Sequence, residues 1–223
     1  MEKTYNDPII VTGVPRSGTS MVTGIFDMCG AFGGNTCGAT PWNQKGQFEN
    51  REIIQSIQKP YMKKIGCCPL GQKYLPKPDD VVLDSSIYDQ TMEVMVSHGL
   101  QPEQIWYFKD CKVALTYQVW LDCFPNATWI IVDRPSEQIV ESCLRQPFMS
   151  AYSSRVQWHD WVARYRLFLD DLERDAEHVF RVWSPSVVSG DYDTIKTAVE
   201  YVGLEWREDA VCDFVEARLF HEN

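Results

Sequence analysis

A glycine-rich stretch near the start of the chain carries the side chains best suited to bind an anion. After the apolar residues 9–11 the sequence reads Gly13-Val14-Pro15-Arg16-Ser17-Gly18-Thr19-Ser20. The spacing is that of the phosphate-binding pattern G-x-x-x-x-G-K-[ST], except that Thr19 replaces the lysine and Arg16 places a cation inside the loop. Two glycines allow a tight turn whose N–H groups, with the N-terminus of a following helix, bind an anion. Arg16 adds a planar donor group for phosphate or sulfate oxygens.

The missing lysine restricts the expected ligand. In nucleotide-binding loops that lysine contacts the β- and γ-phosphates of a triphosphate. We therefore expect a nucleotide whose 5'-chain is shorter or chemically different. A plain connection between a strand and a helix is the alternative reading of the same residues.

Cationic residues also follow two later apolar segments. Lys109 follows residues 105–108, and Arg134 comes directly after Asp133 at the end of residues 129–132. If these segments are parallel strands, their carboxyl ends lie along one edge of a sheet, where open α/β folds bind ligands. We therefore expect Arg16, Lys109 and Arg134 to form a shared anion site.

The elements that would position these residues predict an α/β fold with a mostly parallel central sheet, a three-layer fold like that of P-loop nucleoside triphosphatases. Predicted strands are residues 9–12, 81–83, 105–108 and 129–132, with another at 179–182 or 187–188. Apolar side chains at helical spacing predict a helix over residues 156–172. Segments 29–41 and 69–80 are rich in glycine, proline and polar residues and predict loops.

Length and composition fit one globular domain. The chain has 223 residues, 44% hydrophobic and 23% charged, with a formal net charge of -10, so we expect a single domain over residues 1–223. The negative charge argues against a nucleic-acid partner, and no apolar run reaches the about 18 to 20 residues of a membrane span. The cysteines lack a C-x-x-C pair or histidines at zinc spacing, which predicts free thiols, no metal and a cytoplasmic location.

Two motifs carry a resemblance to a known family. One is the loop from Pro15 to Ser20, and the other is Arg134-Pro135-Ser136-Glu137-Gln138-Ile139-Val140-Glu141-Ser142. Together they resemble the 5'-phosphosulfate loop and the 3'-phosphate site of sulfotransferases that use 3'-phosphoadenosine 5'-phosphosulfate (PAPS). The segment Lys109-Asp110-Cys111-Lys112 is similar to a Lys-Asp-Pro-Arg region of bacterial members. The resemblance extends from Pro8 to Leu204 and is to short bacterial or phage-like members.

The resemblance implies a role for each residue of these motifs. Arg16, Ser17, Gly18, Thr19 and Ser20 would bind the 5'-phosphosulfate, while Arg134 and Ser142 would bind the 3'-phosphate of PAPS or of its product, adenosine 3',5'-bisphosphate (PAP). By analogy with phosphoryl transfer, Arg16 would also bridge the sulfuryl group and the leaving oxygen. Lys109 would stabilise the sulfuryl oxygens or pair with a carboxylate, and both alternatives stay open.

The general base is expected to be a glutamate. Many family members use a histidine two residues after a lysine, but Cys111 stands two residues after Lys109. The stretch Gly46-Gln47-Phe48-Glu49-Asn50 resembles a Gly-x-Phe-Glu stretch of bacterial members, which implies that Glu49 is the base. Burial beside an apolar acceptor would raise the pKa of Glu49 toward neutrality. A structural role as the cap of a helix starting near Asn50 is the alternative.

The expected reaction is transfer of a sulfuryl group to a hydroxyl or amine of a small-molecule or glycan acceptor. Aromatic residues between the first two strands are candidates for an acceptor pocket: Trp42, Phe48, Tyr61 and Tyr74. A P-loop kinase is one alternative, because residues 130–133 resemble a strand that ends in a magnesium-binding aspartate. A non-catalytic nucleotide-binding module is another, because Cys111 replaces the histidine.

Overall fold

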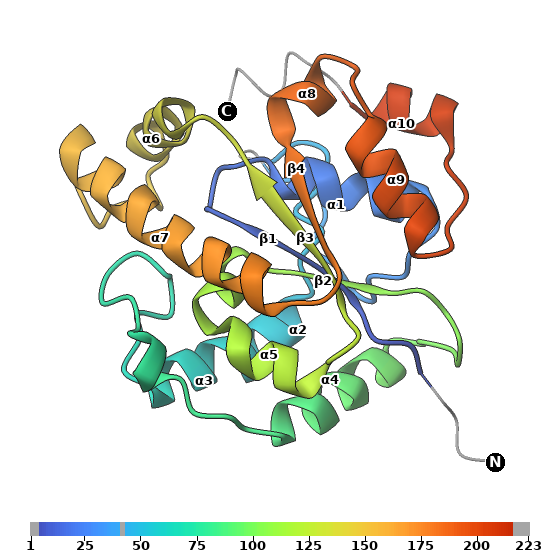
Figure 1. Ribbon diagram of the computed structural model, residues 1–223, viewed down its shortest axis with the longest axis horizontal. Helices are drawn as coiled ribbons and strands as arrows, with labels where there is room; N and C mark the ends of the chain where they lie inside the picture. The colour runs from blue at the N-terminus through green and yellow to red at the C-terminus, as the bar shows by residue number, and fades with distance from the viewer. Residues whose placement is uncertain (1–4, 41–42, 216–223) are drawn as a thin grey trace.

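The computed structural model describes residues 5–40 and 43–215, and its centre is a parallel β-sheet (Figure 1). The described strands are β1 (Ile9–Gly13), β2 (Tyr107–Lys109), β3 (Thr128–Asp133) and β4 (Val179–Trp183). They pair in the order β2-β1-β3-β4, and every pair is parallel. β1 lies in the middle, with Ile9 opposite Tyr107 on one side and Thr128 on the other. The predicted α/β fold with a parallel sheet is confirmed.

Helices cover both faces of this sheet (Figure 1). In chain order they are α1 (Thr19–Met28), α2 (Arg51–Ile53), η1 (Ile54–Gln58), α3 (Lys59–Lys64), η2 (Pro78–Asp80), α4 (Ser86–Ser97), η3 (Cys111–Thr116), α5 (Tyr117–Cys123), α6 (Ser136–Arg145), α7 (Arg155–Asp175), α8 (Ser184–Val188), α9 (Asp193–Tyr201) and α10 (Glu208–Phe214). None of the described helices combines the length and apolar character needed to cross a membrane.

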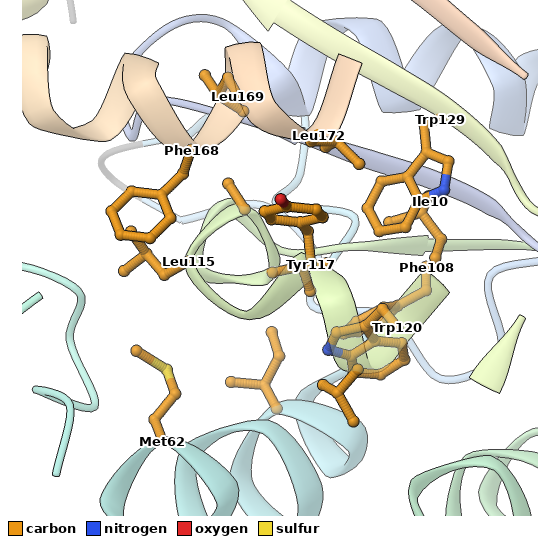
Figure 2. Packing of buried hydrophobic residues seen from close by; sticks show 14 of the residues in the cluster. Ile10, Met62, Phe108, Leu115, Tyr117, Trp120, Trp129, Phe168, Leu169 and Leu172 are labelled. Carbon is orange, nitrogen blue, oxygen red and sulfur yellow. The ribbon is translucent and has the colours of Figure 1, made fainter. Parts of the chain in front are cut away.

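The two faces of the sheet form two separate hydrophobic clusters because successive side chains of a strand point to opposite sides. Ile10 belongs to the larger cluster, which includes side chains from α3, α5 and α7, whereas Ile9 and Val11 belong to the smaller cluster with α1 and α9. Figure 2 shows the larger cluster, in which Trp120 stacks on Phe108 at a ring-centroid distance of 4.8 Å. This three-layer packing fixes the carboxyl ends of the strands, where the cationic residues lie.

The strand predictions hold for the four strands of the sheet and fail for one segment. Residues 81–83 are irregular and do not join the sheet; Val82 and Leu83 are exposed, and the Tyr61 hydroxyl donates to the Val82 carbonyl at 2.7 Å. Of the two alternatives near the C-terminus, residues 179–182 form β4, whereas residues 187–188 lie in α8. The predicted helix over residues 156–172 is confirmed as part of α7.

The two predicted loops are confirmed in outline. Residues 69–77 are irregular, and η2 follows at residues 78–80. Residues 29–40 contain only isolated bridges, in which Phe32 pairs with Trp106 and Thr36 with Asn50. The last residue of that predicted loop, Pro41, lies outside the described residues.

Candidate active site

The loop between β1 and α1 is a tight turn with an unusual backbone. Gly18 and Arg16 have left-handed conformations, with φ angles of 102° and 77°. A Cβ atom at Gly13 would lie 2.3 Å from the carbonyl oxygen of Val132, so only glycine fits where β1 ends beside β3. A non-glycine residue such as Arg16 adopts this conformation only where the surrounding structure imposes it, which is common at functional sites.

Ser17 gives this loop an unsatisfied donor. Its side chain is fully buried, and its Oγ atom has no hydrogen-bond partner among the described residues. A buried hydroxyl without a partner is energetically costly. Together with the backbone amides at the N-terminus of α1, an unpaired hydroxyl fits the binding of an anionic group in the loop.

Arg16 reaches from this loop to helix α6. Its Nε atom donates to the Oγ atom of Ser142 at 2.9 Å, and its guanidinium carbon lies 5.8 Å from the centre of the Phe148 ring. Ser142 is fully buried in α6. Pro135 is the N-cap of this helix, one position before the first helical residue, where proline is most common. The residues predicted for the 5'- and 3'-ends of the nucleotide are thus joined by a direct hydrogen bond.

Arg134 lies against the same loop. Its Nη1 atom donates to the Arg16 carbonyl oxygen at 3.1 Å, and its Nε atom donates to Gln138 at 3.0 Å. Burial, and then the nearby charges of Arg16 and Arg145, lower the pKa of Arg134 to about 10. Burial also lowers the pKa of Arg16, and Arg145 adds to that effect. The cluster therefore has an excess of positive charge that a bound anion would neutralise.

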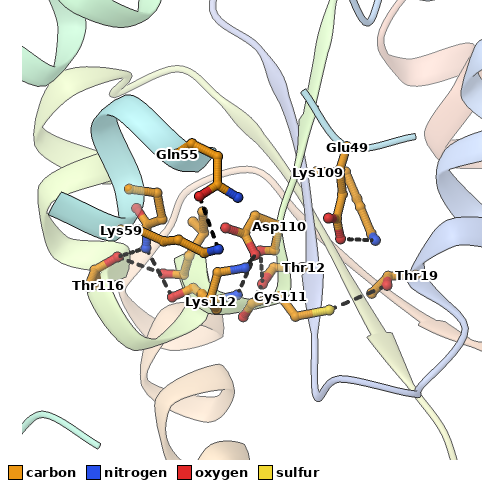
Figure 3. A network of polar contacts seen from close by, with 12 residues as sticks. Thr12, Thr19, Glu49, Gln55, Lys59, Lys109, Asp110, Cys111, Lys112 and Thr116 are labelled. Atoms are coloured by element: carbon orange, nitrogen blue, oxygen red, sulfur yellow. Dashed lines mark hydrogen bonds and ion pairs between the residues drawn. The ribbon is translucent and has the colours of Figure 1, made fainter. Parts of the chain in front are cut away.

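Lys109 and Glu49 form an ion pair at the end of β2. The Lys109 Nζ atom lies 2.7 Å from Glu49 Oε1 and 3.3 Å from the Ser20 Oγ atom, and only 5% of the Lys109 side chain is exposed (Figure 3). The partner of Lys109 is therefore Glu49, not the adjacent Asp110. The Glu49 side chain keeps 27% exposure, so a ligand can reach it.

The expectation that the pKa of Glu49 is raised is wrong. Burial acts to raise it, but the charges of Lys109 and Lys112 and the hydrogen bond from Lys109 outweigh burial and lower the pKa. The pKa of Lys109 is raised: burial acts to lower it, but Glu49 outweighs that effect. The residue that caps α2 is Asn50, whose Oδ1 atom accepts from the Ile53 N–H at 3.3 Å. Glu49 therefore does not cap this helix and instead forms the ion pair with Lys109.

A second ion pair and a further lysine lie next to Glu49, and sequence analysis assigned them no role. Lys112 Nζ lies 2.5 Å from Asp110 Oδ1, and Lys59 Nζ donates to Gln55 Oε1 at 3.2 Å. Figure 3 shows these four side chains gathered beside the Lys109 pair. Lys112 belongs to a motif that the sequence singled out, whereas Lys59 comes from α3, which no sequence pattern linked to the site.

Cys111 occupies the position at which many relatives are expected to have a histidine. Its Sγ atom lies 3.4 Å from the Thr19 Oγ1 atom, and its carbonyl accepts from the Tyr165 hydroxyl at 2.7 Å. Burial raises the pKa of the Cys111 thiol. A neutral thiol is a poor proton acceptor at neutral pH, so Glu49 is the better candidate base.

One cavity of about 420 Å³ connects these groups. Its lining includes the predicted residues Arg16, Gly18, Thr19, Ser20, Glu49, Lys109 and Arg134. Ser17 and Ser142 are not part of the lining; both are fully buried behind it. The structure therefore brings the three predicted cations to one cavity.

The aromatic lining of the cavity differs from the expected one. Phe148 and Phe214 line it, whereas Tyr61 is buried in the core and Tyr74 is 80% exposed. Phe48 lies behind the lining, where it packs edge-to-face against Phe214 of α10 at 5.8 Å. The fourth predicted aromatic residue, Trp42, lies outside the described residues.

The aspartate that suggested a kinase is engaged elsewhere. Asp133 binds Arg166 at 2.8 Å and Arg181 at 3.3 Å, and its Oδ1 atom also accepts from the Arg134 N–H. These contacts occupy both carboxylate oxygens, so Asp133 is poorly placed to bind magnesium. Arg155, at the start of α7, forms surface ion pairs with Glu137 and Glu141.

Solved structures share the fold at low sequence identity. The sulfotransferase STF1 from Mycobacterium tuberculosis H37Rv matches with a TM-score of 0.56 and 13% identity, over 99% of this chain and 74% of that one. The sulfotransferase domain of the curacin biosynthetic pathway matches with a TM-score of 0.58 and 10% identity, over 94% of this chain and 77% of that one. Mouse sulfotransferase SULT7A1 complexed with PAP matches with a TM-score of 0.51 and 9% identity, over 97% of this chain and 65% of that one. No curated protein sequence matches the chain.

The family model covers most of the sequence. A model described as the sulfotransferase family matches residues 8–208, a range that includes the β1–α1 loop, Glu49, Lys109 and the Arg134 to Ser142 segment. The all-parallel sheet and the cationic cavity at its carboxyl edge agree with that match. The chain therefore belongs to the sulfotransferase family and is a transferase.

Proposed function

We propose that the protein transfers a sulfuryl group from PAPS to a hydroxyl or amine of a small-molecule or glycan acceptor. One observation carries the proposal: a single cavity has a cationic loop at Arg16 and Arg134 and an ionised carboxylate, Glu49, beside Lys109. The loop suits the anionic donor, and the carboxylate suits an acceptor that must lose a proton.

On the donor side, the loop would bind the 5'-phosphosulfate. The backbone amides at the start of α1 and the hydroxyls of Ser17, Thr19 and Ser20 supply neutral donors, and the unpaired Ser17 Oγ is one of them. Arg134 would bind the 3'-phosphate, which would also relieve the excess positive charge that lowers its pKa. Ser142 would contribute through its contact with Arg16.

On the acceptor side, Glu49 would accept the proton of the acceptor hydroxyl or amine. Bound PAPS supplies an activated sulfuryl group, whose bond to the 5'-phosphate oxygen breaks as the acceptor atom bonds to sulfur. Lys109, held by Glu49 at 2.7 Å, would stabilise the sulfuryl oxygens. Arg16 would stabilise the charge that develops on the departing phosphate oxygen.

The setting of this reaction is also part of the proposal. All eight cysteines are free thiols in the structure, which supports a reducing compartment, and we propose the cytoplasm. The net charge of -10 supports an acceptor other than a nucleic acid. We further propose that the chain works as a single domain.

Calorimetric titration with nucleotides tests the donor. We expect PAP to bind about 100-fold more tightly than ADP, a difference of about 2.7 kcal/mol, because only PAP carries a 3'-phosphate. Magnesium-ATP, titrated on the same preparation, is the control for a kinase. Preference for magnesium-ATP, or binding of none of these nucleotides, would contradict the proposed donor.

Arg134→Ala is expected to lower the affinity for PAP by about 10- to 150-fold. This loss is equivalent to one charge-assisted hydrogen bond of about 1.5 to 3 kcal/mol. ADP affinity should change by less than about threefold, because ADP has no 3'-phosphate. The affinity for ADP therefore also shows whether the loop keeps its conformation when the hydrogen bond from Arg134 to the Arg16 carbonyl is lost. Arg155→Ala, at a surface ion pair, is the matched control. Equal losses for PAP and ADP would disprove this assignment of Arg134.

A further inference from the structure

The acceptor end of the cavity contains more positive charge than the proposed reaction uses. The described cations that line the cavity are Arg16, Lys45, Lys59, Lys109, Lys112 and Arg134, and the lining carboxylates are Glu49 and Asp110. The chain as a whole has a net charge of -10. A local excess of cations on an acidic protein indicates an anionic ligand.

Five of these six cations fall into two groups that act on different neighbours. The charges that shift the pKa of Arg134 are those of Arg16 and Arg145, on the donor side. The charges that act on Lys59 are those of Lys112, Asp110, Glu49 and Lys63. Lys59 and Lys112 therefore belong to the Glu49 end of the cavity, not to the predicted nucleotide end.

At this second end, Lys59 is the cation without a carboxylate partner of its own. Lys109 pairs with Glu49 and Lys112 with Asp110, whereas Lys59 donates to the neutral Gln55 and forms no ion pair with any described residue. Burial and the charge of Lys112 lower the pKa of Lys59, and the carboxylates do not offset them. An ammonium in this position, without a carboxylate partner, gains from a bound anion.

The local backbone holds Lys59 toward the cavity. Pro60 has no N–H to donate within the helix, and the π-helical turn η1 lies directly before Lys59. Gln58, the last residue of η1, donates to the Lys112 carbonyl at 3.3 Å and accepts from Trp120 at 2.9 Å. These bonds fasten the end of η1 to η3 and α5, so Lys59, the next residue, is kept beside Lys112 (Figure 3).

Asp110 adds a second recognition point. Its Oδ1 atom accepts from Lys112, but its Oδ2 atom is buried and has no partner among the described residues. An unpaired carboxylate oxygen needs a donor, such as a hydroxyl or amide N–H of a ligand. A ligand for this end of the cavity thus combines an anionic group with hydrogen-bond donors.

We infer that the acceptor is itself an anion, whose carboxylate or phosphate group binds to Lys59 and Lys112 while its reacting hydroxyl or amine lies at Glu49. This inference rests on the proposed function, because it specifies the acceptor of that reaction. The ligand chemistry is that of a hydroxylated carboxylic acid or phosphate ester, with the hydroxyls available to Asp110.

Matched acceptor pairs test the inference. Galacturonate with galactose, glucose 6-phosphate with glucose, and 4-hydroxyphenylacetate with 4-hydroxyphenylacetamide differ within each pair in the anionic group. Binding to the PAP-saturated protein is measured by calorimetry, and transfer of labelled sulfuryl from PAPS is measured for every compound. We expect an anionic member to exceed its neutral partner by about tenfold in affinity and in kcat/KM in at least one pair.

Variants on α3 assign this preference to Lys59. Lys59→Met should reduce the preference to within about twofold, whereas Lys63→Met, on the same helix and exposed, should keep it. PAP affinity should be unchanged in both. Equal or absent binding of both members of every pair, a preference that survives Lys59→Met, or loss of PAP affinity in that variant would overturn the inference. PAP selectivity over ADP reports on the proposed function separately.

Discussion

Replacing Arg16 with alanine is expected to lower kcat for sulfuryl transfer by about 10³-fold, the upper range for loss of one group that stabilises developing charge. Arg16 is the cation inside the β1–α1 loop, and it lies with Arg134 in a cluster whose arginines have lowered pKa values. A steady-state assay with PAPS, run with whichever acceptor gives turnover in the wild-type protein, measures the loss.

Structural side effects of this substitution are expected to be small. Alanine keeps a Cβ atom, so the left-handed backbone at φ 77° is no more strained than with arginine. The hydrogen bond to Ser142 is lost, and thermal unfolding measures its contribution to the stability of the fold. Arg16→Lys, which keeps the charge and loses the planar donor group, should retain part of the activity. Activity of Arg16→Ala within about tenfold of the wild type would disprove the proposed role.

Glu49→Gln is expected to lower kcat by about 10²- to 10⁴-fold, the range for loss of a positioned general base. PAP affinity should stay within about threefold, because Glu49 meets the donor loop through Lys109, which donates to Ser20, rather than through its own carboxylate. The same substitution leaves Lys109 buried without its counter-charge, which costs about 3 to 5 kcal/mol of folding free energy. Calorimetric unfolding and steady-state kinetics measure the two effects independently.

A double variant separates catalysis from stability at this pair. Glu49→Gln with Lys109→Met removes both charges, so most of the lost folding free energy should return. Activity should stay low, because the double variant lacks both the proposed base and the lysine proposed to stabilise the sulfuryl oxygens. Recovery of activity together with stability would show that Glu49 only balances the charge of Lys109.

The pH dependence follows from the direction of the shift. The pKa of Glu49 lies below its ordinary value of 4.5, so Glu49 is ionised and able to accept a proton through the neutral range. The acid limb of kcat should therefore lie below that of an ordinary carboxylate, without a limb near neutrality from this group. Because the folded-state pKa is depressed, the stability that the pair contributes is present above the unfolded pKa and is lost as pH falls through the folded one.

Much of this site could be predicted from sequence because three of its cations follow strands directly. Arg16, Lys109 and Arg134 each come within a few residues of a strand end, and a parallel sheet places those ends on one edge. The spacing from Arg134 to Ser142 likewise fits within a single helix, α6. Residues 81–83 were mispredicted because a short apolar segment looks alike whether or not a neighbouring strand pairs with it.

The acceptor side could not be predicted in the same way, since its residues meet through tertiary contacts. The pKa of Glu49 depends on Lys109, which lies 60 positions later in the chain. Lys59 lines the cavity, and it stands directly after a π-helical turn and before Pro60. No periodicity in the sequence reveals such a turn, and no motif connects it with Asp110.

The packing of Phe214 on Phe48 makes the acceptor side of the cavity depend on α10. Phe48 stands next to Glu49 in a left-handed conformation, with φ 55°, and Phe214 comes so close to α1 that a Cβ at Gly24 would lie 2.2 Å from its ring. Phe214 packs edge-to-face on Phe48 and also lines the cavity. Loss of α10 would therefore remove part of the cavity wall together with the packing that supports the residue before Glu49.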